Sequence, residues 1–182
     1  MPITKAARRY ANAFLELAKE RNEVESILGD VKFIHNTFED SRELVMFLKS
    51  PIIKYDDKKA ALKQLFFDET EELTQLFIKL LIRKERVNLL NQIAEAFIEL
   101  YKKYAGIITI DVFVARELSD DQQQALHAKL EQKTQKKVEM NITIDESLRG
   151  GMAIRIDDTV IDGTVKHKLV ELEESLLSTV VE

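Results

Sequence analysis

The sequence predicts an α+β protein, with a six-helix bundle over residues 1–105 followed by a small β-α-β-β-α domain over residues 106–182. Two observations support this class. Apolar residues recur with the spacing of amphipathic helices as far as residue 105, and from Gly106 onward they alternate with polar residues, as in strands. A chain of 182 residues is also long enough for two hydrophobic cores. The domain boundary is therefore expected at this change of period.

The first three helices are predicted from apolar stripes and end signals. Thr4 is a helix cap, and the break before the second helix is expected at Arg21-Asn22. The third helix is expected to end near Pro51, because a residue before proline is pushed out of the helical region. The apolar positions are Tyr10, Ala11, Phe14, Leu15, Leu17 and Ala18 in the first helix, Val24, Ile27, Leu28, Val31, Ile34 and Phe38 in the second, and Leu44, Phe47 and Leu48 in the third.

Three more helices are expected before the boundary. Asp56 or Asp57 is predicted to cap the fourth, and Asp68 or Thr70 the fifth, while Gly106 ends the sixth. The residues expected to be buried are Leu62, Leu65 and Phe66 in the fourth helix, Leu73, Leu76, Phe77, Leu80 and Leu81 in the fifth, and Val87, Leu90, Ala94, Phe97, Tyr101 and Tyr104 in the sixth.

The second part alternates strand and helix patterns. Strands are expected over 108–114 and 138–144, with a helix between them that opens at the capping box Ser119–Gln122 and turns Leu126 and Leu130 inward. Residues 152–156 and 160–161 form a hairpin around Asp157-Asp158. Thr164 caps a last helix with Val165, Leu169, Leu172, Leu176 and Val180 on its apolar stripe. The helices are expected to pack on a small sheet.

Composition and motifs point away from enzymatic chemistry. The chain has no cysteine and only three separated histidines, so neither a thiolate nor a histidine metal site is expected. No phosphate-binding loop and no G-x-S-x-G elbow occurs. The adjacent acids of the chain are typical of turns and helix starts, and Asp162 with His167 lacks a nucleophile. We expect no catalytic residue, no metal and no cofactor.

The charge distribution bears on possible partners. The net charge is −5, and the acidic excess lies in the second part. A β-α-β-β-α unit with a glycine pair suggests RNA binding, but such domains need a basic face, so nucleic acid is not expected. No apolar run is long enough to cross a bilayer. Protein–protein interaction remains the favoured class.

The first and fifth helices offer the best candidate surface. The stripes of the first helix are broader than one neighbouring helix covers, and the fifth carries Phe77, Ile78, Leu81 and Ile82. Together they predict a groove for a partner's amphipathic helix. Periodicity alone supports equally the alternative that all of these residues are core.

Three of the five glycines fall between residues 145 and 169. Gly150-Gly151 precedes the predicted hairpin, and Asp162-Gly163-Thr164 separates it from the last helix. Such clustering indicates backbone geometry that a side chain would obstruct. A tight hairpin and a strand-to-helix corner are favoured over a ligand site, because no catalytic group accompanies the glycines.

The whole chain resembles the delta subunit of F-type ATP synthase, whose mitochondrial counterpart is the oligomycin-sensitivity-conferring protein. The resemblance rests on 9–14 (Arg-Tyr-Ala-Asn-Ala-Phe), 47–53 (Phe-Leu-Lys-Ser-Pro-Ile-Ile), 80–82 (Leu-Leu-Ile), and a C-terminal signature through 144–169 that contains Gly150-Gly151 and Asp162-Gly163-Thr164. The sequence departs from the family at 83–86, where an Asn-Gly turn is common, and has threonine at 164 and valine at 114 where serine is common.

The resemblance implies a non-catalytic stator part. Residues 1–105 would bind the N-terminal helices of the alpha subunits on the catalytic head, and residues 106–182 the C-terminal region of the b subunits in the peripheral stalk. The subunit would resist rotor torque and so couple ion flow to ATP synthesis. The residues expected to bind the head are Arg9, Tyr10, Ala13, Phe14, Leu17, Phe77, Ile78, Leu81 and Ile82.

The resemblance also implies a location. The chain would lie at the cytoplasmic face of a bacterial cell membrane, attached only through the complex, because its start shows no presequence pattern. The alternative function is a general helix-binding adaptor unrelated to the synthase.

Overall fold

A computed structural model describes residues 3–50, 52–156 and 158–179, the last six of these through their backbone alone. The chain is of the α+β class and divides into two compact units, Met1–Tyr104 and Ala105–Glu182. Pro51, Asp157 and Val180, which were expected in a helix stop, a hairpin turn and the last helix, lie outside the described residues.

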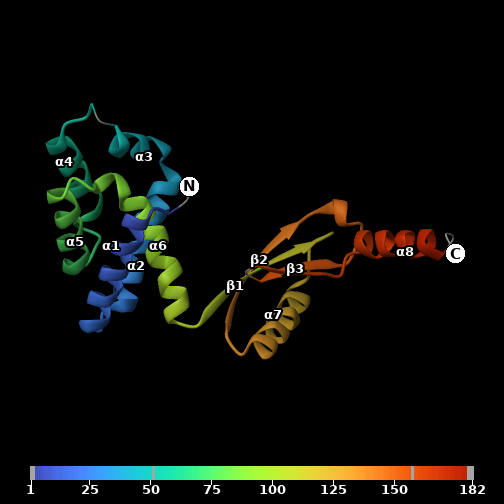
Figure 1. Cartoon of the computed structure of the whole chain (residues 1–182). Helices are drawn as coiled ribbons and strands as arrows, with labels where there is room; N and C mark the ends of the chain where they lie inside the picture. Colours follow the sequence, from blue (N-terminus) through green and yellow to red (C-terminus); the bar gives the residue numbers. More distant parts are fainter. Residues whose placement is uncertain (1–2, 51, 157, 180–182) are drawn as a thin grey trace. The chain divides into compact units, whose positions relative to one another are not determined.

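The first unit is helical (Figure 1). Its described elements are α1 (Lys5–Glu20), α2 (Val24–Asp40), α3 (Arg42–Lys49), α4 (Tyr55–Phe66), α5 (Glu72–Arg83), a 3₁₀ turn η1 (Val87–Leu89) and α6 (Leu90–Tyr104). One hydrophobic core joins them, and within it the Phe14 ring contacts the rings of Phe77 and Phe97. The predicted long sixth helix is thus divided, since its first turn is the separate η1.

The ends of α1 follow the sequence signals. Thr4 has an extended backbone, and its hydroxyl accepts a hydrogen bond from the amide of Ala7 at 3.2 Å. At the other end Asn22 adopts φ of 57°, a left-handed conformation that asparagine tolerates better than most residues. The predicted cap and break are both confirmed.

The start of α4 differs from the prediction. The residue before the helix is Lys54, and neither Asp56 nor Asp57 caps it, because both lie within its first turn. There they act on the helix through charge, since carboxylates are favoured beside the positive end of the helix dipole. Leu65, expected to be buried, is 40% exposed.

A residue of another helix caps α5. The carboxylate of Asp30, buried in α2, accepts hydrogen bonds from the amide of Glu71 at 2.9 Å and the hydroxyl of Thr74 at 2.6 Å. The predicted caps are therefore wrong. Thr70 instead donates its hydroxyl to the carbonyl of Phe66 at 2.6 Å. Asp30 accepts hydrogen bonds at the start of a helix 41 residues away, and no local sequence motif reveals such a pairing.

The second unit is built on a four-stranded mixed sheet. Its elements are β1 (Ile107–Val114), α7 (Asp120–Thr134), β2 (Lys137–Ile144), the 3₁₀ turn η2 (Glu146–Leu148), β3 (Met152–Ile156), β4 (Thr159–Asp162) and α8 (Val165–Thr179). The strand order is β2-β1-β3-β4, with β1 parallel to β2 and antiparallel to β3. The predicted hairpin is confirmed, because β3 and β4 pair antiparallel, and its two strands make the full order β-α-β-β-β-α rather than β-α-β-β-α.

One face of this sheet carries the second core. Ile110, Val112 and Val114 point to this face, and Leu130 of α7 packs against them. The predicted capping box is confirmed, because the Ser119 hydroxyl accepts from the Gln122 amide and the Gln122 side chain accepts from the Ser119 amide.

The opposite face of the sheet mixes polar and apolar side chains. Asn141 donates to the carboxylate of Asp111 at 3.0 Å, and the guanidinium of Arg155 lies 5.1 Å from the ring centre of Phe113. The helix α8 does not cover the sheet as expected. Its contacts are with η2, and Figure 1 shows it continuing past the end of the strands. Its side chains from Val165 to Glu173 are exposed.

Candidate functional site

The exposed face of α1 carries part of the predicted head-binding set. Arg9 and Ala13 are exposed, Leu17 is 38% exposed, and Tyr10 is half-buried against the core. These residues recur at spacings of three and four, so they share one side of the helix. We call Arg9, Tyr10, Ala13 and Leu17 the α1 face.

The remaining predicted residues do not line an open groove. Phe14 stacks on Phe77 with ring centres 4.1 Å apart, which places α1 against α5. The buried members are Phe14, Phe77, Ile78, Leu81 and Ile82, none more than 9% exposed. The prediction of an open groove is wrong for these five, because the two helices fill the space between them with their own rings. All five belong to the hydrophobic core of the first unit.

Sequence reasoning missed the exposure of Leu76 on α5. It was assigned to the buried stripe, yet it is 44% exposed. Its neighbour Phe77 occupies the inward position instead. Because Leu76 and Phe77 are adjacent and both apolar, the helical period does not show which of them is buried. The breadth of the apolar stripe on α5 was the sign in the sequence that one of its members could be exposed.

The glycine-rich signature forms a tight corner in the second unit. Gly151 has φ of 75°, and a Cβ added to it would lie 2.4 Å from the carbonyl oxygen of Gly163. The Gly163 amide donates to the Met152 carbonyl at 2.9 Å, and the Val165 amide donates to the Gly150 carbonyl at 3.0 Å. The corner therefore fixes the first turn of α8 against the segment that enters β3.

Thr164 and Asp162 shape the start of α8 within this corner. Thr164 is buried, and its hydroxyl accepts from the His167 amide at 3.1 Å, which confirms the predicted cap. The Asp162 carboxylate accepts from the Thr164 amide at 2.8 Å. The backbone hydrogen bond from Thr164, followed by the one from its side chain, lowers the pKa of Asp162. This carboxylate stabilises the corner rather than acting as a base.

The C-terminal part of this unit exposes many apolar side chains. Val160 and Ile161 of β4 are 57% and 58% exposed, and Val165, Leu169, Val170 and Leu172 of α8 lie between 42% and 56%. We call these six residues the C-terminal apolar surface. Val165, Leu169 and Leu172 share one side of α8, and apolar residues gathered on one side mark interaction sites, whereas Val160 and Ile161 are consecutive on β4 and point to opposite faces of the sheet. The sequence placed three of them, Val165, Leu169 and Leu172, on the apolar stripe of the last helix, which was expected to pack on the sheet.

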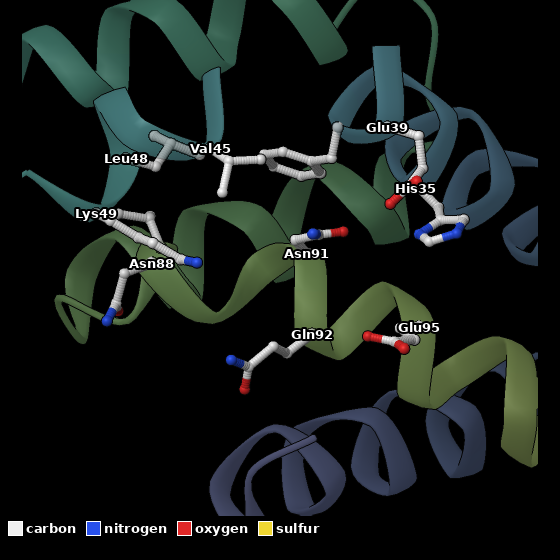
Figure 2. Close-up of a pocket in the computed structure, with 11 residues that line it drawn as sticks. His35, Glu39, Val45, Leu48, Lys49, Asn88, Asn91, Gln92 and Glu95 are labelled. Carbon is white, nitrogen blue, oxygen red and sulfur yellow. The ribbon is translucent and has the colours of Figure 1, made fainter. Parts of the chain in front are cut away.

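A cavity of about 170 Å³ opens in the first unit between α2, α3 and α6 (Figure 2). His35 and Glu39 of α2 face Asn91 and Glu95 of α6 across it. The sequence predicted no metal or catalytic role for His35, and it gave no sign of the cavity. Across the described residues no helix is long and apolar enough to cross a membrane, and no three acidic or histidine side chains gather as a metal site.

Comparison with known proteins gives a consistent result over both units. The family model described as ATP synthase delta (OSCP) subunit matches residues 6–176. The chain belongs to the ATP synthase delta (OSCP) subunit family. This family supplies a structural subunit of ATP synthase, in the stator that holds the complex against its rotor.

Individual family members match over nearly their full length. ATP synthase subunit delta of Chlorobium chlorochromatii is 38% identical over 178 residues, covering 98% of this chain and 99% of its own. The Chlorobaculum tepidum subunit is 40% identical over 173 residues, covering 95% and 96%. A chain in the cryo-EM structure of the Toxoplasma gondii mitochondrial ATP synthase hexamer matches with a TM-score of 0.73 and 25% identity, over 96% of this chain and 98% of that one.

Proposed function

We propose that this protein links the catalytic head of ATP synthase to its peripheral stalk, with one unit for each partner. Residues 1–104 bind N-terminal helices of alpha subunits, and residues 105–182 bind the C-terminal region of the b subunits. The subunit performs no catalysis and needs no cofactor. It lies at the cytoplasmic face of a bacterial membrane, held there by the complex. The observation that carries the proposal is the family match, which spans both units.

The α1 face supports the assignment of the head to the first unit. Leu17 and Ala13 expose apolar atoms beside the half-buried ring of Tyr10, and Arg9 adds a positive charge at one end. An amphipathic partner helix needs apolar anchors at spacings of three and four, which this face provides. The buried stack of Phe14 on Phe77 keeps the face rigid, so little order is lost on binding.

The C-terminal apolar surface supports the assignment of the stalk to the second unit. Val165, Leu169 and Leu172 on α8 are separated by four and then three residues, the spacing of a coiled-coil seam. The seam is exposed along the described side chains of α8. The edge strand β4 exposes two more apolar side chains, Val160 and Ile161, one on each face of the sheet. A helical stalk protein is the kind of partner that covers such a seam.

Two single substitutions in the full chain test the two assignments together. Leu17→Asp places a charge on the α1 face, and Leu169→Asp places one on the seam. We expect Leu17→Asp to weaken binding to purified catalytic head while binding to the b subunits stays unchanged, and Leu169→Asp to do the reverse. Loss of a central apolar anchor typically costs at least about 1 kcal/mol, so each affinity should fall roughly fivefold or more.

Matched controls separate these surfaces from general apolar exposure. Leu65→Asp alters a 40% exposed leucine of α4, and Ile144→Asp alters a 54% exposed isoleucine of β2, at the sheet edge away from β4. Neither should change either affinity. If Leu17→Asp and Leu169→Asp, both still folded, bound both partners normally, the proposed surfaces would be wrong.

A further inference from the structure

The cavity between α2, α3 and α6 contains two buried polar atoms without a hydrogen-bond partner. They are Nδ1 of His35 and Oδ1 of Asn91. Both residues line the cavity, and Figure 2 shows the Asn91 side-chain oxygen directed toward the His35 ring. An unsatisfied buried polar atom is costly to a protein, and few exist in native structures. The pair indicates that a donor group belongs between them.

The chemistry of these atoms defines what that donor must be. Asn91 Oδ1 can only accept, and His35 Nδ1 accepts when the ring proton lies on Nε2. In this tautomer both atoms are acceptors, so a carbonyl or carboxylate from outside cannot satisfy them. A group with several N–H donors can satisfy both at once.

The charges around the cavity favour a cationic donor. Glu39 and Glu95 line it, and Figure 2 shows their carboxylates on the same side as the His35 ring. Lys49 brings one positive charge to the lining, which leaves two carboxylates against one ammonium. The positive charge of an incoming group is therefore favoured over a neutral amide.

An apolar wall completes the cavity. Phe38, Val45, Leu48 and Val87 line it, and Phe38, Leu48 and Val87 are at most 5% exposed. Such a wall covers the methylene stem of a long basic side chain. Arginine fits these features better than lysine, because its planar fork carries five donors and is less strongly hydrated.

We propose that this cavity is a binding pocket for an arginine side chain of a partner protein. The guanidinium donates to Asn91 Oδ1 and His35 Nδ1 and is neutralised by Glu39 and Glu95, while its stem packs on the apolar wall. The pocket lies apart from the α1 face, since none of its lining residues belongs to α1. The proposal does not rest on which subunit each unit binds.

The test is an NMR titration of the labelled full chain with N-acetyl-arginine methylamide. Parallel titrations use the lysine and the norleucine derivatives, which share the stem and differ in the head group. We expect saturable shifts of the His35 ring and the Asn91 side-chain amide with arginine, weaker ones with lysine, and none with norleucine. Equal responses to arginine and norleucine, or no saturable response to arginine, would overturn the proposal.

Two variants link the response to the unpartnered oxygen. Asn91→Leu removes this acceptor and should abolish the arginine response. It should not lower the unfolding temperature, because the removed oxygen makes no hydrogen bond in the folded protein. Asn36→Leu alters an exposed asparagine of α2 outside the pocket and should leave the response intact. A contact in the free protein between the Asn91 amide protons and His35, with no response to arginine, would show that the amide turns to satisfy its own neighbour. That result would refute the arginine pocket. A cavity that takes up water and shows no saturable response to arginine would refute it too.

Discussion

Gly151→Ala should destabilise the second unit through one added methyl group. The new Cβ would lie 2.4 Å from the carbonyl oxygen of Gly163, where ordinary contact begins near 3.4 Å, so the backbone must move by about an ångström. The left-handed φ of 75° adds a cost of about 1–2 kcal/mol for a residue with a side chain. Together with roughly 1–3 kcal/mol for overpacking, the expected loss is about 3 kcal/mol.

The tyrosines allow the two units to be measured separately. All four tyrosines, Tyr10, Tyr55, Tyr101 and Tyr104, lie in the first unit, so tyrosine fluorescence reports on that unit and far-ultraviolet circular dichroism reports on both. In guanidinium unfolding, Gly151→Ala should move the dichroism transition of the second unit to lower denaturant by about 1 M. The fluorescence transition should stay where it is.

Two other glycines provide graded controls. Gly106 shares a left-handed φ, 67°, but has open space around its missing Cβ, so Gly106→Ala should cost only about 1–2 kcal/mol. Gly29 lies within α2 with nothing nearby, so Gly29→Ala should stabilise the first unit by about 0.5–1 kcal/mol. If Gly151→Ala proved no more costly than Gly106→Ala, the close approach of the corner would be refuted.

Two further predictions concern buried and titrating carboxylates. Asp30→Ala removes the cap of α5 and leaves the Thr74 hydroxyl without its acceptor, so the fluorescence transition should shift by about 2 kcal/mol; an unchanged transition would exclude this cap. The pKa of Asp162 is lower in the folded protein than its ordinary value of 3.8. Its ionised carboxylate therefore stabilises the fold at pH above 3.8, and this stabilisation is lost as the pH falls through the pKa of the folded state. Asp162→Asn should therefore flatten the acid dependence of the dichroism transition, and an equally steep dependence would remove Asp162 as its source.

Local signals in the sequence predicted most of the helices and strands. The hydroxyl caps at Thr4, Ser119 and Thr164 depend on residues within four positions, so a sequence pattern contains the whole interaction. The cap of α5 could not be predicted this way. Asp30 reaches Glu71 only after α2 and α5 have packed together, and tertiary structure replaces the local cap.

The candidate surfaces were harder to predict than the elements. Periodicity places Phe77 and Leu76 on neighbouring positions of one broad stripe, but only packing shows that Phe77 is buried and Leu76 exposed. The same limit applies to α8, where the stripe of Val165 and Leu169 was expected to cover the sheet and instead faces outward. An apolar stripe reveals that a helix needs a partner, and it does not reveal whether that partner is in the same chain.

Site-specific crosslinking tests most directly the claim that each unit holds a different part of the synthase. The chain has no cysteine, so Leu17→Cys and Leu169→Cys each introduce a single attachment point for a photoactivated crosslinker. In membranes that carry the assembled complex, mass spectrometry should identify the alpha subunit as the product from position 17 and the b subunit from position 169. The same partner at both positions, or the two partners exchanged, would contradict this account.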